Sequence, residues 1–125
     1  MTFAQYAGKG GEPGKGPKDT VIVKFDDRWQ KQASWAFPER VIVKWGTMSS
    51  SGGTWAGRLL YTTGHDAPEL YVLAVPASGS TLQLREVVRM ESHGQGIAVD
   101  RTTGLLYSIQ RRTREVLVSE LPAIQ

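Results

Sequence analysis

Two histidines and two acidic residues occupy short polar segments in which they could bind a metal ion. His65 and Asp66 are adjacent, and Glu91 and His93 follow two positions apart further along the chain. Imidazole nitrogens and carboxylate oxygens are ligands for divalent cations, and a bound cation can activate a water molecule. His65, Asp66 and Glu91 therefore form a candidate divalent-metal site, and no other cofactor is expected. In the alternative interpretation Asp66 caps a turn through its side chain and His65 faces solvent.

A second candidate site is the segment from His93 to Gly96. Its two glycines allow the backbone to approach a ligand closely, while His93 and Gln95 supply hydrogen-bond donors and acceptors. The alternative is a tight turn that leads into the next strand.

Two basic segments could attract an anion. Arg111 and the neighbouring arginines could hold a carboxylate or phosphate through paired N–H donors, although a basic hairpin loop is usually solvated. The glycine-rich segment from Gly8 to Pro17 lacks the spacing of a Walker loop, because Lys9 and Gly16 stand where a glycine and a Ser or Thr are required. A phosphate-binding loop of that kind is therefore excluded.

The composition excludes several classes of protein. The chain has 125 residues, 40% hydrophobic and 22% charged, which is typical of one soluble globular domain. A net charge of +3 is too small to indicate nucleic-acid binding. The chain contains no cysteine, so it has no disulfide, thiolate nucleophile or cysteine-based zinc site. No G-x-S-x-G elbow, signal peptide or membrane-spanning apolar run is recognisable, and the compartment stays open.

The elements that must position these residues are contained in an internal repeat. Leu59-Leu60-Tyr61 recurs as Leu105-Leu106-Tyr107. With the same offset Glu69, Val72 and Pro76 fall on an identical glutamate, valine and proline in the second copy, at Glu115, Val118 and Pro122. A period of about 40–50 residues built from short apolar runs is typical of propeller blades, which bury their faces against neighbouring blades.

Short β-branched and apolar runs separated by Gly, Pro and Asp predict strands and almost no helix. The predicted strands are Thr2–Tyr6, Thr20–Phe25, Gln32–Phe37, Val41–Trp45, Thr54–Ala56, Arg58–Thr63, Glu69–Val75, Thr81–Met90, Gly96–Val99, Leu105–Ile109 and Glu115–Leu121. The last unit stops one strand short of the unit before it.

Gly96-Ile97-Ala98-Val99-Asp100 followed by Thr103-Gly104-Leu105-Leu106-Tyr107 resembles the core of NHL-type and gluconolactonase-like six-bladed β-propellers. The resemblance implies an all-β fold of antiparallel four-stranded blades. It also implies one domain, residues 1–125, with blade-like units at about 2–45, 53–90 and 96–122 and therefore an incomplete ring. Two copies pairing to complete the ring, a longer polypeptide and an open stack of sheets are the alternatives.

In such propellers the loops between second and third strands, and those leading into the next blade, open on one face around the central channel. The resemblance then implies a ligand site lined by His65, Asp66, Glu69, His93, Gln95 and Arg111. Because this fold carries many activities, a binding or interaction scaffold for an unknown small molecule or protein is expected, with no nucleic-acid or membrane partner. The alternatives are a lactonase-like metal-dependent hydrolase and a truncated propeller without independent activity.

Overall fold

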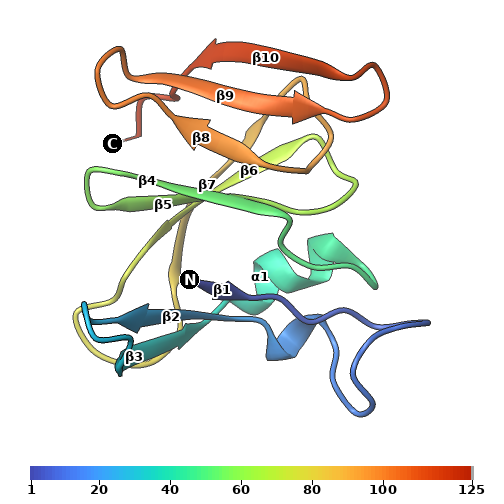
Figure 1. The fold of residues 1–125 in the computed structure, drawn as a ribbon, viewed down its shortest axis with the longest axis vertical. Coiled ribbons are helices and arrows are strands. Elements are labelled where there is room, and N and C mark those ends of the chain that lie inside the picture. Colours follow the sequence, from blue (N-terminus) through green and yellow to red (C-terminus); the bar gives the residue numbers. More distant parts are fainter. Residues whose placement is uncertain (125) are drawn as a thin grey trace.

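Three β-sheets follow one another along the long axis of the molecule (Figure 1). The computed structural model describes residues 1–124. In that part of the chain the sheets have the strand orders β1-β2-β3, β4-β5-β6-β7 and β10-β9-β8, and all neighbouring strands within them are antiparallel. The predicted all-β class is confirmed.

The observed strands fall close to the predicted ones. Their bounds are β1 Thr2–Phe3, β2 Val21–Phe25, β3 Lys31–Ala36, β4 Gly52–Ala56, β5 Leu59–Thr63, β6 Glu69–Ala74, β7 Gln83–Arg89, β8 Ile97–Val99, β9 Leu105–Gln110 and β10 Glu115–Glu120. The glycine-rich segment from Gly8 to Gly16 contains no helix or strand, and a single 3-10 turn, η1, follows it at Pro17–Asp19.

The predicted strand Val41–Trp45 is wrong, because this segment is helical. A short helix, α1 (Glu39–Ile42), continues into a 3-10 turn, η2 (Val43–Trp45). Val41 and Trp45 are both buried while Val43 is exposed, and residues four apart lie on the same face of a helix. The Trp45 ring packs edge-on against Phe37 with 4.9 Å between ring centroids. Burial of this one face outweighs the β-propensity of the Val-Ile-Val run.

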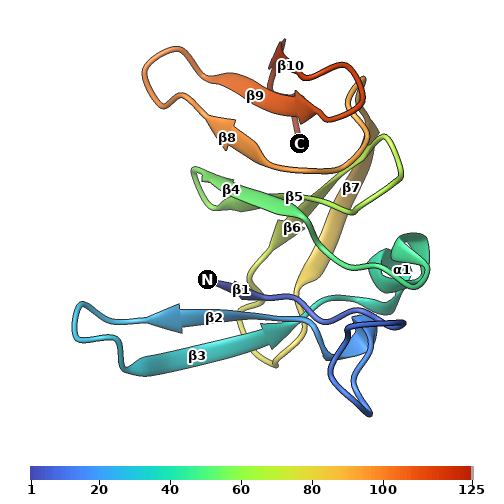
Figure 2. The ribbon, with the colours of Figure 1, turned by 45° about the vertical axis from the view of Figure 1, so that its right-hand side comes forward.

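The second sheet contributes residues to two separate cores. Leu60, Tyr71 and Leu73 belong to a cluster that includes Ile22 of the first sheet. Tyr61, Leu70 and Val72 belong to a cluster with Leu106 of the third sheet. Because side chains alternate along a strand, β5 and β6 cover the first sheet with one face and the third sheet with the other (Figure 2).

The connection that leads into β7 joins the first two sheets. Thr81 forms a parallel bridge with Ala36 at the end of β3. The Ala36 N–H donates to Ser80 O at 2.8 Å, and the Leu82 N–H donates to Ala36 O at 2.9 Å. The chain therefore borders the first sheet before it becomes the last strand of the second.

The two copies of the repeat differ in what covers them. Tyr61 pairs with Val72 across β5 and β6, and Tyr107 pairs with Val118 across β9 and β10. Tyr61 and Val72 are 4% and 0% exposed, because the third sheet packs on them. Tyr107 and Val118 are 37% and 53% exposed. The third sheet thus has a face that is equivalent to a buried one but lies open in residues 1–124.

Candidate functional site

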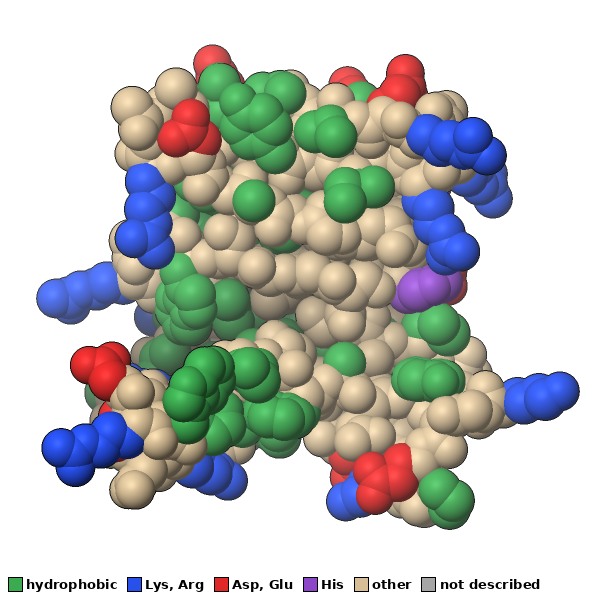
Figure 3. All heavy atoms as spheres, in the orientation of Figure 1, with side chains coloured by type: hydrophobic (Ala, Val, Ile, Leu, Met, Phe, Trp, Pro, Cys, Tyr) green, Lys and Arg blue, Asp and Glu red, His purple; other side chains and the backbone are tan. Residues whose placement is uncertain are grey.

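Three loops meet at the junction of the second and third sheets and form a polar pocket of about 400 Å³. They are the β5–β6 loop, the β7–β8 loop and the β9–β10 turn. The residues that line this polar pocket are His65, Asp66, His93, Gln95, Gln110, Arg111 and Arg112. Figure 3 shows a histidine at the right-hand edge of the molecule with Lys or Arg side chains directly above it.

Hydrogen bonds between the loops fix the pocket wall. The Thr63 hydroxyl donates to Gln95 O at 2.6 Å, and His93 Nδ1 lies 3.1 Å from Asp66 O. The Gln110 side-chain amide donates to Glu91 O at 3.3 Å. Each bond joins a loop or the strand end beside it to a different loop, so the three segments form one wall.

Two glycines allow this close approach of the loops. A Cβ on Gly94 would overlap the backbone carbonyls of Gly64 and His65, and a Cβ on Gly52 would overlap Gln95 O. Gly94 also has a positive φ of 64°, which side chains disfavour. These positions require glycine. At Gly94 the close neighbour is the backbone of the β5–β6 loop, and the predicted approach of this segment to a ligand stays a prediction.

Gln95 holds an unusual backbone conformation at the pocket. Its φ is 67°, one of three positive values among non-glycine residues in the described part of the chain. Left-handed backbone costs a non-glycine residue about 1–2 kcal/mol. The hydrogen bond from Thr63 to the Gln95 carbonyl holds the loop in this conformation. Such strain is found preferentially at ligand sites.

The histidine and acid pair forms part of the lining. His65 Nδ1 lies 2.7 Å from Asp66 Oδ1. When His65 donates this hydrogen bond, its Nε2 remains able to accept one from a ligand. In that case the Asp66 carboxylate accepts the hydrogen bond from His65.

Glu69 lies outside the polar pocket, although the other five predicted ligand residues line it. Its carboxylate accepts hydrogen bonds from Lys44 Nζ at 3.1 Å and from the Tyr71 hydroxyl at 2.9 Å. Desolvation raises the pKa of Glu69, but the hydrogen bonds from Lys44 and Tyr71 and the lysine charge outweigh it, so the net pKa is lowered. Burial, followed by the bond to Glu69, raises the pKa of Tyr71. Glu69 thus stabilises the segment that follows α1.

The predicted metal ligands do not gather in one place. His65 and Asp66 line the polar pocket, whereas Glu91 lines a neighbouring groove between the sheets. Within residues 1–124 no group of three or more His, Cys, Asp or Glu side chains has the arrangement of a metal site. The metal site and the hydrolase that would use it stay predictions.

Gln110 lines the pocket but is not among the predicted ligand residues, and Arg112, one of the arginines expected to hold an anion, lines it as well. The offset of the repeat places Gln110 on Gly64 and Arg112 on Asp66. The segments where the two copies differ thus converge on one pocket, and that alignment is the signal that identifies both residues.

No model of a known protein family matches the chain, no curated protein matches it, and no solved structure matches it. No helix within residues 1–124 is long and apolar enough to cross a membrane.

Proposed function

We propose that this chain is a propeller-type binding module that takes a small anionic molecule, bearing a carboxylate or phosphate, into the polar pocket. The observation that carries the proposal is the convergence of three loops, joined by hydrogen bonds, on one pocket of about 400 Å³. Mostly preformed concave sites with a few placed polar groups are the usual form of small-molecule sites.

The charge of the lining favours an anion. Arg111 and Arg112 carry permanent positive charges, and Asp66 is the acidic residue among those that line the pocket. Asp66 is already hydrogen-bonded to His65. A guanidinium matches a carboxylate or phosphate through two parallel N–H donors. Gln95, Gln110 and His93 add further side chains that can donate hydrogen bonds.

Isothermal titration calorimetry with inorganic phosphate and with citrate tests this proposal. The double variant Arg111→Gln/Arg112→Gln should lose at least tenfold in affinity for whichever anion binds. Arg114→Gln is the matched control, because Arg114 lies in the same turn but does not line the pocket. Equal affinities in all three proteins, or no heat from either anion with the wild type, would refute an anion site.

The propeller-type architecture is supported by the repeated packing of the sheets. The face that carries Tyr61 and Val72 is covered by the next sheet, and the equivalent face carries Tyr107 and Val118. Ile109 and Val116, which pair directly with each other, extend this outer face of the third sheet, and both are exposed.

A matching apolar surface lies at the other end of the stack. Phe3 packs on Phe25, and Phe25 packs on Trp29, with ring centroids 6.2 Å and 5.9 Å apart. Phe3 and Trp29 are exposed, and hydrophobic side chains gather over β1 and β2 in Figure 3. Two copies complete the ring by packing the outer face of each third sheet on the aromatic cluster of the partner's first sheet. This contact buries apolar surface that a monomer exposes.

A further inference from the structure

The third sheet ends in a strand whose outer edge has no partner in residues 1–124. Its order is β10-β9-β8, so β10 is an edge strand, whereas β6, the equivalent of β10 in the repeat, pairs with β7. An unpaired strand edge presents a row of backbone donors and acceptors that another extended segment can use.

The directions of the backbone groups on β10 follow from those on β9. The Ile109 N–H donates to Gly96 O, and Leu105 O accepts from the Asp100 N–H, so both residues point toward the β8 side. Directions alternate along a strand, so Leu106, Ser108 and Gln110 point to β10 and bond with Ser119, Leu117 and Glu115. The N–H and C=O groups of β10 that face outward belong to Val116, Val118 and Glu120.

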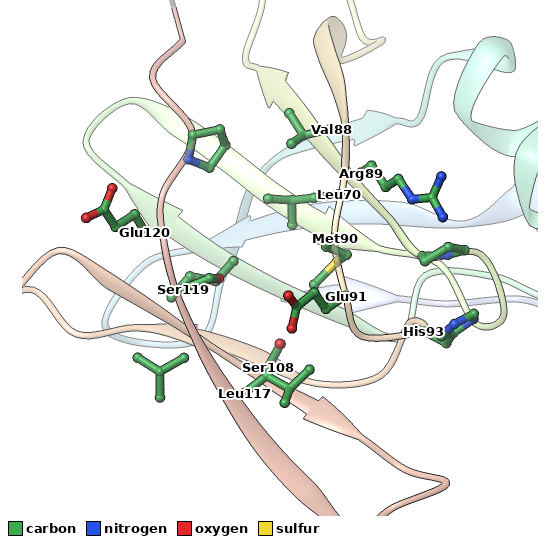
Figure 4. A pocket seen from close by; sticks show the side chains of 14 residues that line it. Leu70, Val88, Arg89, Met90, Glu91, His93, Ser108, Leu117, Ser119 and Glu120 are labelled. Atoms are coloured by element: carbon green, nitrogen blue, oxygen red, sulfur yellow. The ribbon is translucent and has the colours of Figure 1, made fainter.

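An apolar groove of about 650 Å³ runs beside this edge, between the third sheet and the second. Leu70, Val88 and Met90 lie on the second-sheet side of the groove, opposite Leu117 and Ser119 on β10 (Figure 4). A strand paired to β10 would direct every other side chain into this inter-sheet groove, alongside Leu117 and Ser119. Backbone bonds and side-chain burial therefore coincide at one place.

Charges at the two ends of β10 indicate what kind of segment fits. Glu115 and Glu120 mark its two ends, and Glu91 lines the groove. In the first copy of the repeat the equivalent of Glu115 is Glu69, which lies directly opposite Arg89 of β7. Opposite charges across a strand pair are favourable, so the edge suits a segment with basic residues near its ends.

We propose that the free edge of β10 and the inter-sheet groove bind an extended peptide segment of another protein, with alternating aliphatic side chains and basic residues near its ends, as an added antiparallel strand. This site differs from the polar pocket, and it uses the edge of the third sheet rather than its outer face. Main-chain hydrogen bonds provide affinity in this mode of recognition, and the side chains in the groove provide specificity.

The probe is a fluorescent peptide with the sequence of residues 83–90, because β7 already plays this part beside β6. Its binding to the wild-type protein is measured by anisotropy. Two further versions carry N-methyl groups on alternate backbone amides, one version on the odd and one on the even positions. Only amides that face β10 donate to it, so one version should lose at least tenfold in affinity and the other should bind like the parent peptide.

Protein variants locate the same site. Val118→Pro removes an outward N–H and should weaken binding at least tenfold. Arg58→Gln, in the turn between β4 and β5, lies outside the groove and should bind normally. Exchange of the peptide's arginines for glutamates should weaken binding, and Glu115→Lys/Glu120→Lys should restore it.

Several results would overturn the proposal. They are no saturable binding, equal loss or equal retention with both methylated peptides, and binding unaffected by the charge exchange. The methylated peptides keep the test decisive even where Val118→Pro fails to fold. A dimer that dissociates in Val118→Pro but persists in Tyr107→Lys, with no peptide bound, would instead assign the edge to a second copy and also refute the proposal.

Discussion

The hydroxyl of Thr63 donates a 2.6 Å hydrogen bond to the backbone carbonyl of Gln95. Thr63 is the last residue of β5 and is fully buried, and Gln95 stands in the β7–β8 loop with a left-handed backbone. This bond connects the second sheet to the loop that opens the third. It also fixes the position of Gln95, which lines the polar pocket just before the start of β8.

Thr63→Val should destabilise the protein by about 1–3 kcal/mol, because it leaves the Gln95 carbonyl without its donor. Thr62→Val is the matched control, since the Thr62 hydroxyl is buried and has no hydrogen-bond partner within residues 1–124. The control should be neutral or stabilising. Urea unfolding measures both, and an equal loss in the two variants would contradict the role given to Thr63.

Gln95→Gly should keep or raise the stability by up to about 1 kcal/mol, because glycine adopts a positive φ without the cost that glutamine bears. It should nevertheless weaken anion binding, because the side chain that lines the polar pocket is lost. Calorimetric titration and thermal unfolding of the same sample separate the two effects. Gln95→Ala should lose binding as well, without the gain in stability.

Glu69→Gln should destabilise the protein at neutral pH and make no difference in acid. The folded-state pKa of Glu69 is lowered, so the stabilisation is fully present above the pKa of the unfolded state, about 4.3. It is lost as the pH falls through the folded-state value. Urea midpoints of wild type and variant should therefore differ at pH 7 and converge once the pH has fallen below the folded-state pKa of Glu69; a constant difference would contradict a role for the ionised carboxylate.

Val41→Ala should cost about 2 kcal/mol, because two buried carbon atoms are removed from a packed core. Val43→Ala, on the exposed side of the same segment, should change stability by less than about 0.5 kcal/mol. A strand would place both valines on one face and give similar losses. Chemical unfolding of the pair thus distinguishes the helical segment from the strand that the sequence predicts.

The wild-type protein should have the mass of a dimer in sedimentation equilibrium. Tyr107→Lys should shift it toward the monomer, because the outer face of the third sheet would then bury a charge. Arg114→Lys, in the adjacent turn, should leave the mass unchanged. A wild-type monomer at high concentration would exclude completion of the ring by pairing.

The sequence predicts most of the fold because its strands are short, alternating and bounded by glycine and proline. Leu59 to Val75 and Leu105 to Leu121 recur with one offset, and both form hairpins in the same register. The sequence fails at Val41–Trp45, where local β-propensity favours a strand but burial of Val41 and Trp45 on one side selects a helix. Propensity alone does not contain that tertiary information.

The positions of the site residues can be predicted only where the flanking strands are predicted correctly, because the strands set where each loop lies. Once β5–β6 and β9–β10 are hairpins, His65 and Arg111 occupy equivalent turns. The place of Glu69 is not predictable in this way, because its partner Lys44 lies in the helical segment that the sequence does not indicate. Because the sequence predicts a strand at Val41–Trp45, it assigns Glu69 to the ligand site, whereas in the structure Glu69 forms an ion pair with Lys44.

The bridge between Ala36 and Thr81 bears on the order in which the sheets unfold. The first two sheets share backbone hydrogen bonds through residues 80–82, so neither can separate without breaking them. The third sheet contacts the second through side chains and loops. The repeat divides the chain before β4 and again before β8. On unfolding, we expect β8–β10 to separate from the rest while the first two sheets stay together, so the repeating unit and the unfolding unit differ.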